Sequence, residues 1–262
     1  MLAPTRGMLL LHYRHQGVTS APPVVLLHGL FGDLDNLGAL ARTLASHHQV
    51  IQLDLPNHGA SPQSADMHWA TMCQQLLALL DHQGWEQVSL VGHSLGGKLA
   101  MQFALRYPQR VTHLVVVDIA PVRYAPRHDS VIAALQAVAT QPEISRKEAD
   151  DLMTPWLADA GVRQFLLKSF APGKGWRFNL SALVDNYPTL MDWEELPGRF
   201  DGAALFIKGG SSDYLLPEYQ ARILALFPRA KARIIQEAGH WLHAEKPALF
   251  NKLVVDFLST SR

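Results

Sequence analysis

The sequence predicts an α/β protein with a mostly parallel central sheet flanked by helices. Short runs rich in β-branched residues alternate with longer segments of helical periodicity, which is typical of a parallel sheet with crossover helices. The chain has 262 residues, of which 48% are hydrophobic, and this is enough to bury a large core. The expected strands are residues 8–14, 24–29, 50–55, 88–92, 113–120, 204–210 and 232–239.

The intervals between most of these strands carry apolar residues at helical spacing. Residues 65–83 form one such interval and are followed by Gly84, a typical stop at a helix C-terminus. Residues 95–106 form another, and it ends just before Pro108. A last helix is expected after Pro247. These helices are expected to pack on the sheet.

One long interval departs from the alternation of strands and helices. Residues 123–192 contain helix-like stretches but no run that predicts a strand. We therefore expect a small helical cap there, inserted between a first core segment at 1–122 and a second at 193–262. The insertion follows the C-terminal end of a strand, where open α/β folds place their sites. The cap is thus expected to shape the pocket.

Composition excludes several classes of function. Lys plus Arg (23) balance Asp plus Glu (23), so no net charge attracts nucleic acid or an anionic membrane. The single cysteine, Cys73, allows no internal disulfide or cysteine metal cluster and indicates a reducing compartment. The apolar run at 8–11 is too short for a signal-peptide core, and no later run reaches membrane-span length. We expect a cytoplasmic protein with no nucleic-acid partner; the sequence does not indicate its oligomeric state.

The stretch VGHSLGGKL at 91–99 fits two motifs. Its glycines and Lys98 match the G-x-x-x-x-G-K-[ST] phosphate loop as far as the lysine. That motif then needs a Ser or Thr hydroxyl for magnesium, and the next residue here is Leu99, on the apolar stripe of the following helix. The phosphate-loop interpretation therefore fails, and Lys98 is expected to be an ordinary helix side chain.

The same stretch contains the G-x-S-x-G turn of a nucleophilic serine, centred on Ser94. That turn joins a strand to a helix and leaves little room for side chains two residues before and after the serine, where Gly92 and Gly96 stand. Gly97 lets the helix approach the sheet closely. A serine hydroxyl alone is a poor nucleophile, so the hypothesis requires a histidine base and an acid.

The chain offers these partners in the order serine, acid, histidine. His240 follows the last expected strand and is the candidate base; His243 is expected to have a structural or pocket-edge role, and His93 to point away from the nucleophile. Asp118 and Asp213 each follow a strand, and either carboxylate is able to accept the imidazole N–H. The acid therefore stays open between these two.

An oxyanion hole needs two backbone amides aimed at the developing charge. Leu95, directly after the nucleophile, is the first expected donor. Leu30 is the second, because the strand before it ends in His28 and Gly29 and the loop turns back there. Neither the amides nor the Ser, His and Asp set calls for a metal or an organic cofactor.

Taken together, these segments resemble the α/β-hydrolase superfamily, and in particular the bacterial YbfF-type esterases and their mitochondrial relatives of the abhydrolase-domain-containing 11 type. The resemblance is carried by LLHGLFGDLDNLGALARTL, DLPNHGASP, VGHSLGGK, VVVDIAPVRY and GHWLHAEKP. It implies carboxylic-ester hydrolysis, no metal, no organic cofactor, and a small helical cap after the sixth strand position. It slightly favours Asp118 as the acid, and implies that Ser212 forms a hydrogen bond in the pocket. Having Asp213 after Ser212 departs from the pattern, as does Pro56 where the superfamily has an arginine.

The predicted function is therefore hydrolysis of short- to medium-chain acyl esters through an acyl-enzyme. Apolar cap residues such as Trp156 and Phe170 are candidates for the acyl pocket, although most such residues form a cap's own core. An acyl-CoA thioesterase would use the same triad, with Arg123, Arg127 and Lys174 near the phosphates. The alternative from another class is a weakly catalytic ligand-binding or signalling protein of the same fold.

Overall fold

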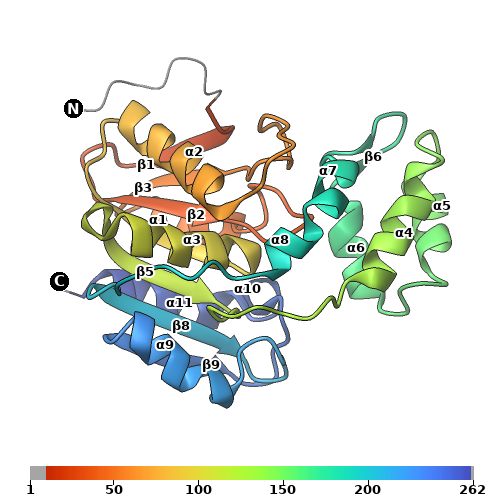
Figure 1. The fold of residues 1–262 in the computed structure, drawn as a ribbon. Helices are drawn as coiled ribbons and strands as arrows, with labels where there is room; N and C mark the ends of the chain where they lie inside the picture. Colours follow the sequence, from red (N-terminus) through yellow and green to blue (C-terminus); the bar gives the residue numbers. More distant parts are fainter. Residues whose placement is uncertain (1–9, 261–262) are drawn as a thin grey trace.

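The computed structural model describes residues 10–260 and has one seven-stranded sheet at its centre. The strand order is β1-β3-β2-β4-β5-β8-β9; β1 is antiparallel to β3 and the other neighbouring pairs are parallel. The strands are β1 Tyr13–Gly17, β2 Pro23–Leu27, β3 Gln49–Leu53, β4 Val88–His93, β5 Val111–Val117, β8 Ala203–Gly209 and β9 Ala230–Ile235. The predicted mostly parallel sheet is confirmed (Figure 1).

Six of the seven expected strands lie where the sequence places them, within a few residues. The first one differs: the prediction covered 8–14, of which 8 and 9 lie outside the described residues, and β1 begins only at Tyr13. His12 explains the late start, since its amide donates to Ser61 Oγ at 2.8 Å and its carbonyl accepts from Asp54 N at 2.9 Å. The chain before Tyr13 is therefore held by a loop rather than by the sheet.

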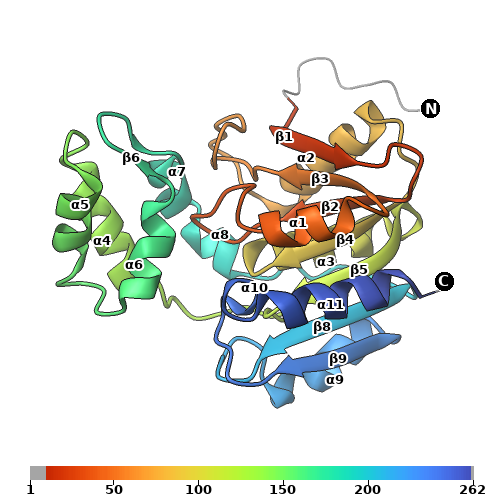
Figure 2. The same cartoon turned by 180° about the vertical axis from the view of Figure 1, so that it is seen from behind.

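Helices cover both faces of the sheet, as the composition and alternation predict. Side chains of β2 alternate between two cores, with Val24 and Leu26 on one face and Val25 and Leu27 on the other. The first face packs against α1 and α11 (Figure 2) and the second against α2, α3 and α9 (Figure 1). The core helices are α1 Gly38–Leu44, α2 Trp69–His82, α3 Leu95–Arg106, α9 Gln220–Leu226, α10 Leu242–Glu245 and α11 Pro247–Leu258, with short 3-10 turns at Pro108–Arg110 and Pro217–Tyr219.

The segment at 123–192 forms a mostly helical unit beyond the carboxyl ends of the parallel strands (Figures 1 and 2). It contains α4 Asp129–Ala139, α5 Arg146–Met153, α6 Ala160–Leu167, β6 Phe170–Ala171, β7 Gly175–Trp176, α7 Leu180–Asp185 and α8 Tyr187–Met191. We refer to this unit as the cap. The expectation of no strand here was wrong, because β6 and β7 pair as an antiparallel hairpin. Each has two residues, too few for an alternating pattern to be visible in the sequence.

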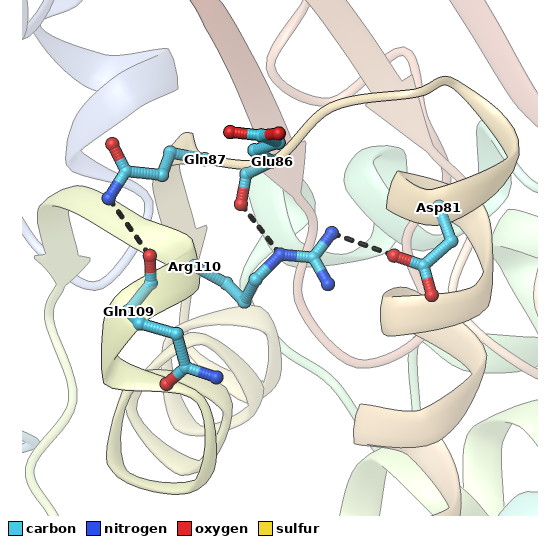
Figure 3. Close-up of a pocket in the computed structure, with 5 residues that line it drawn as sticks. All are labelled: Asp81, Glu86, Gln87, Gln109 and Arg110. Atoms are coloured by element: carbon cyan, nitrogen blue, oxygen red, sulfur yellow. Dashed lines mark hydrogen bonds and ion pairs between the residues drawn. The ribbon is translucent and has the colours of Figure 1, made fainter. Parts of the chain in front are cut away.

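Within residues 10–260, no helix combines the length and apolar composition needed to cross a bilayer. A hollow of ≈ 410 Å³ lies at the amino edge of the sheet, near the start of β4 and β5. Figure 3 shows that its polar groups bond to one another: Arg110 donates to Asp81 at 2.8 Å and to the Glu86 carbonyl at 2.6 Å, and Gln87 donates to the Gln109 carbonyl at 2.9 Å. This hollow is a structural junction at the edge opposite Ser94.

Candidate active site

Ser94 lies in a strained turn between β4 and α3, with φ 53° and ψ −115°. The surrounding glycines are required by space: a Cβ on Gly92 would meet the Gly96 carbonyl oxygen at 2.2 Å, and a Cβ on Gly96 would meet the Leu27 carbonyl oxygen at 2.3 Å. A side chain at either position is therefore incompatible with the turn. A strained serine held by its surroundings is typical of a functional site.

Ser94, His240 and Asp118 form one hydrogen-bonded series. Ser94 Oγ lies 2.9 Å from His240 Nε2, and His240 Nδ1 lies 2.7 Å from Asp118 Oδ2. Asp118 can only accept, so Nδ1 carries the proton and Nε2 is free to accept from the serine hydroxyl. Ser94 follows β4, Asp118 follows β5 and His240 follows β9, so the carboxyl edge of the sheet brings together residues far apart in the sequence.

Asp118 is fully buried, with 0% exposure, and both of its carboxylate oxygens are bonded. Oδ1 accepts from the Gly209 amide at 2.9 Å, and Oδ2 accepts from the Ser212 hydroxyl as well as from His240. These bonds fix the orientation of the carboxylate and compensate the burial of its charge. Ser212 thus contacts the acid that orients His240, whereas the resemblance implied a pocket role.

Asp213 has different surroundings, although it follows Ser212 directly. Its side chain is 74% exposed and pairs with Arg127 at 2.5 Å. The hydrogen bond from the Arg127 guanidinium holds the pKa of Asp213 below its usual range. Of the two candidate acids, the structure brings Asp118 to His240 and places Asp213 in a surface ion pair.

Leu95 and Leu30 both border the pocket beside Ser94. Within residues 10–260 neither amide has a hydrogen-bond partner, as an oxyanion hole requires. Leu95 is the first residue of α3, where amides lie beyond the reach of intrahelical carbonyls. Leu30 lies in the loop after β2, where the next residue, Phe31, has φ 63°.

Two buried histidines hold the Leu30 loop. His58 Nε2 accepts from the Phe31 amide at 3.1 Å, and its Nδ1 donates to the Pro56 carbonyl at 2.9 Å. His28 Nε2 accepts from the Leu55 amide at 3.0 Å, and its Nδ1 donates to the Gly29 carbonyl at 2.7 Å. Burial lowers the pKa of His28 to about 4 and that of His58 to about 3, so both rings stay neutral and able to accept.

The loop that carries His240 is supported by His93 and His243. His93 Nε2 donates to the His240 carbonyl at 2.8 Å, and the His93 ring lies 4.4 Å from the His243 ring, centroid to centroid. Burial lowers the pKa of His93 well below its usual value and that of His243 to about 3. Both rings are therefore neutral and pack beside His240.

Comparison with known proteins gives a consistent result. The alpha/beta hydrolase fold family matches residues 22–247. The chain is 47% identical over 226 residues to esterase YbfF of Escherichia coli K12, covering 86% of this chain and 88% of that protein. It is 38% identical over 254 residues to the sn-1-specific diacylglycerol lipase ABHD11 of Mus musculus, covering 93% of this chain and 83% of the lipase. A solved marine microorganism esterase superposes with a TM-score of 0.91 at 34% identity, covering 95% of this chain and all of that one.

The chain belongs to the alpha/beta hydrolase fold family. The predicted resemblance is therefore confirmed, and relatives named esterase and lipase identify the chain as a carboxylic ester hydrolase. Within residues 10–260 of this hydrolase, no three His, Cys, Asp or Glu side chains come together as a metal site.

The pocket of this hydrolase beside Ser94 is narrow, with a volume of ≈ 30 Å³. It is lined by the two expected amide donors and by side chains from the core and the cap, namely Lys98, Ile119, Tyr124, His128, Leu190, Met191 and Tyr214. Trp156 and Phe170 are absent from this lining. Trp156 is 51% exposed on the cap surface, and Phe170 is buried against Trp176, so both differ from the expected pocket role.

Several residues around the site escape the sequence analysis. The Tyr214 ring stacks on the His240 imidazole, with centroids 3.7 Å apart and an interplanar angle of 17°. The Arg127 guanidinium lies 3.8 Å from the centroid of the Tyr214 ring, and His128 Nε2 lies 3.2 Å from the Tyr214 hydroxyl. Aromatic side chains placed shortly after a candidate acid are the only sequence signal for this arrangement, and it is weak.

Lys98 also departs from expectation. Far from being an ordinary helix side chain, it is 2% exposed and donates hydrogen bonds to backbone carbonyls of the cap. Burial lowers the pKa of its ammonium to about 7. Leu99, in contrast, lies in the core as predicted, which leaves no hydroxyl for a phosphate loop.

Proposed function

We propose that this hydrolase cleaves short-chain carboxylic esters through a covalent acyl-enzyme on Ser94, with His240 as base and Asp118 as the acid that orients it. The hydrogen-bonded series of these three side chains is the observation that carries the proposal. The burial of Asp118 and the surface ion pair of Asp213 support the choice of acid.

In the first half of the reaction, His240 Nε2 takes the Ser94 proton while Oγ bonds to the ester carbonyl carbon. The resulting imidazolium is stabilised by the Asp118 carboxylate and then protonates the leaving alcohol as the carbon–oxygen bond breaks. In the second half, His240 deprotonates a water that attacks the acyl carbon. Ser94 Oγ leaves and recovers the proton, which releases the carboxylic acid and restores the site.

The tetrahedral intermediates place negative charge on the former carbonyl oxygen. We assign its stabilisation to the amides of Leu30 and Leu95, which are unpartnered and border the pocket. Removing one such donor in a comparable site costs about 10²–10³ in kcat. His58 is in this proposal a positioning residue, because it engages the adjacent Phe31 amide and so fixes the loop that carries Leu30.

The acyl group is assigned to the apolar pocket beside Ser94, and the segment at 123–192 to the role of a cap over it. The pocket, at ≈ 30 Å³, is far smaller than the roughly 300–1,000 Å³ typical of sites that enclose drug-sized ligands. This favours the short end of the predicted acyl range.

One observation favours an acyl-CoA thioester as a second candidate substrate. A hollow of ≈ 320 Å³ between cap and core is lined by Arg146, Lys168 and Arg177, cations suited to phosphate groups. The sequence analysis had expected Arg123, Arg127 and Lys174 in this role, and none of these three lines the hollow. Asp33 and Asp35 also border it. Comparing kcat/KM for acetyl-CoA and p-nitrophenyl acetate distinguishes the two substrates.

The test of the proposal is Ser94→Ala, assayed with p-nitrophenyl acetate and with a fluorophosphonate that labels activated serines. We expect turnover to fall by about 10⁶-fold and the label to be lost, as for removal of a comparable nucleophile. Ser89→Ala is the matched control: Ser89 lies in β4, the strand that leads to Ser94, and bonds Thr112 at 2.9 Å, so its replacement should leave rate and labelling unchanged. Ester turnover that survives Ser94→Ala would refute the proposal.

A further inference from the structure

Lys98 is a buried cation in the helix that follows the nucleophile. It lies one turn beyond Ser94 in α3, and its Nζ donates to the carbonyls of Asp192 at 2.8 Å, Met191 at 3.0 Å and Leu190 at 3.4 Å. An ammonium has three protons, so these three carbonyls match its full donor capacity. Burying such a charge is costly unless it is bonded in this way.

The three carbonyls stand at the C-terminal end of α8, where the chain leaves the cap. Carbonyls at a helix end have no intrahelical partners, and a cation there also complements the helix dipole. The rings of Tyr124 and Trp69 flank the ammonium, with centroids 5.1 Å and 5.8 Å from Nζ. Lys98 is thus enclosed by carbonyl oxygens and aromatic faces and acts as a clamp on the end of α8.

Two further side chains on the same face of α3 hold the next residues of the returning chain. Gln102 Nε2 donates to the Glu194 carbonyl at 2.9 Å, and the Arg106 guanidinium pairs with the Glu194 carboxylate at 2.6 Å. Residues four apart lie on one face of a helix. Lys98, Gln102 and Arg106 therefore tie three successive turns of α3 to residues 190–194, which we call the return segment.

The return segment forms one wall of the pocket beside Ser94. Leu190 and Met191 line that pocket together with Leu95 and the Lys98 side chain. The carbonyls held by Lys98 belong to these same two residues and their neighbour, so the position of the ammonium determines how close the wall stands to the nucleophile. Protein interiors are close-packed, so a small displacement of this wall changes which acyl groups fit into a pocket of ≈ 30 Å³.

From this geometry we infer that Lys98 is a positioning residue that sets the acyl length accepted, by clamping the wall formed by Leu190 and Met191. This inference rests on the ester hydrolysis proposed above. Without the clamp, the carbonyls of Leu190 and Asp192 lose their donor, while that of Met191 keeps the Tyr124 amide at 2.8 Å. The return segment then moves toward solvent to regain the lost hydrogen bonds, and the pocket widens. Longer acyl chains then fit, while short ones lose contact with the wall.

The test compares kcat/KM for p-nitrophenyl hexanoate and acetate in the full chain. Lys98→Met removes all three donors at similar volume, and Lys98→Gln keeps an N–H donor on a side chain one bond shorter, which protects the fold. We expect the hexanoate-to-acetate ratio to rise about 10-fold in Lys98→Met and less in Lys98→Gln, the scale expected for a methylene in a hydrophobic pocket. A general loss of stability would lower both rates and leave the ratio unchanged.

Lys252→Met provides the matched control, since Lys252 pairs with Asp256 on the exposed side of α11 and is 68% exposed. Its ratio should equal that of the wild type. An unchanged ratio in Lys98→Met and Lys98→Gln, in an enzyme that hydrolyses esters, would overturn the inference.

A second readout does not depend on catalysis. Hydrogen exchange of amides in residues 187–194 should be at least about threefold faster in Lys98→Met than in the wild type, because the clamp opposes local opening. Unchanged exchange would show that Lys98 does not hold the segment. If exchange is faster in Lys98→Met but the wild type turns over no ester, Lys98 does hold the segment. The proposed function and the role of Lys98 in acyl length would then both be refuted.

Discussion

The catalytic edge of the core and the return segment of the cap are fixed by different kinds of interaction. At the catalytic edge, steric limits dominate: a Cβ on Gly92 would meet the Gly96 carbonyl, one on Gly96 would meet the Leu27 carbonyl, and Ser94 is held at φ 53°. The return segment is held by hydrogen bonds and an ion pair instead. It is held by α3 through bonds between residues that are 88 positions apart for Arg106 and Glu194 and up to 94 positions apart for Lys98 and Asp192.

Because of this difference, we expect the reaction rate and the choice of substrate to depend on different regions of the molecule. The hydrogen-bonded series at Ser94 depends on the sheet edge, where rigid strands set the positions of the side chains. The size of the neighbouring pocket depends on how the cap returns to the core. Substitutions at the edge are thus expected to change the rate for all substrates, and substitutions that move the return segment to change the rate for some.

The largest expected effect lies at the catalytic edge. It distinguishes the two candidate acids, the buried Asp118 and the exposed Asp213. Asp118→Asn should lower kcat by about 10⁴-fold, because an amide neither stabilises the imidazolium nor holds the same tautomer of His240. Asp213→Asn is the matched substitution and should stay within about threefold of the wild type, since an exposed ion pair contributes about 0–1 kcal/mol. Ester turnover by both purified variants is the measurement, and a reversed order would assign the acid to Asp213.

Most of the fold and the strained turn at Ser94 were predictable from the sequence, because strands, helices and this turn leave patterns in nearby residues. β-branched runs locate the strands to within a few residues, and the motif G-x-S-x-G spans only five positions, although the space at Gly96 is limited by the distant Leu27 carbonyl. Which carboxylate bonds His240 was not decidable, since Asp118 and Asp213 both follow strands. What separates them is the Gly209 amide on Asp118, which comes from a strand 91 residues away.

Lys98 was misassigned for a related reason. A lysine on an amphipathic helix is usually solvent-exposed, but α3 is buried along both sides, by the sheet and by the return segment. The available signal was composition: LGGKLAMQFALR is apolar nearly all round, which predicts burial. Its few polar residues, spaced four apart at Lys98, Gln102 and Arg106, then need partners. Only the tertiary structure names those partners as Leu190 to Glu194.

An effect of intermediate size concerns pH and the histidines that support the catalytic edge. Burial lowers the pKa of His28 to about 4 and those of His58 and His243 to about 3, while an unfolded histidine titrates near 6.5. Below pH 6.5 the unfolded state therefore binds more protons than the folded state. Stability should fall as pH drops from 6.5 toward 4, by about 1.4 kcal/mol per unit for each such histidine.

Urea unfolding at pH 7, 6 and 5 measures the slope of the free energy of unfolding against pH. His58→Gln removes one titrating group while keeping an oxygen that accepts from the Phe31 amide, so its slope should be shallower than that of the wild type by about one histidine's share. Equal slopes would mean that His58 is not a neutral acceptor in the folded state.

The smallest expected effects lie in the cap, away from the return segment. Trp156 is 51% exposed, so Trp156→Ser should change stability by less than about 0.5 kcal/mol and leave the hexanoate-to-acetate ratio unaltered. Phe170 packs against Trp176 with ring centroids 5.2 Å apart, and Phe170→Leu should cost about 1 kcal/mol in urea unfolding, again with an unaltered ratio. A changed ratio in Trp156→Ser would mean that the cap surface closes over the substrate during turnover. Acyl selection would then depend on a cap movement and not on the wall that Lys98 holds.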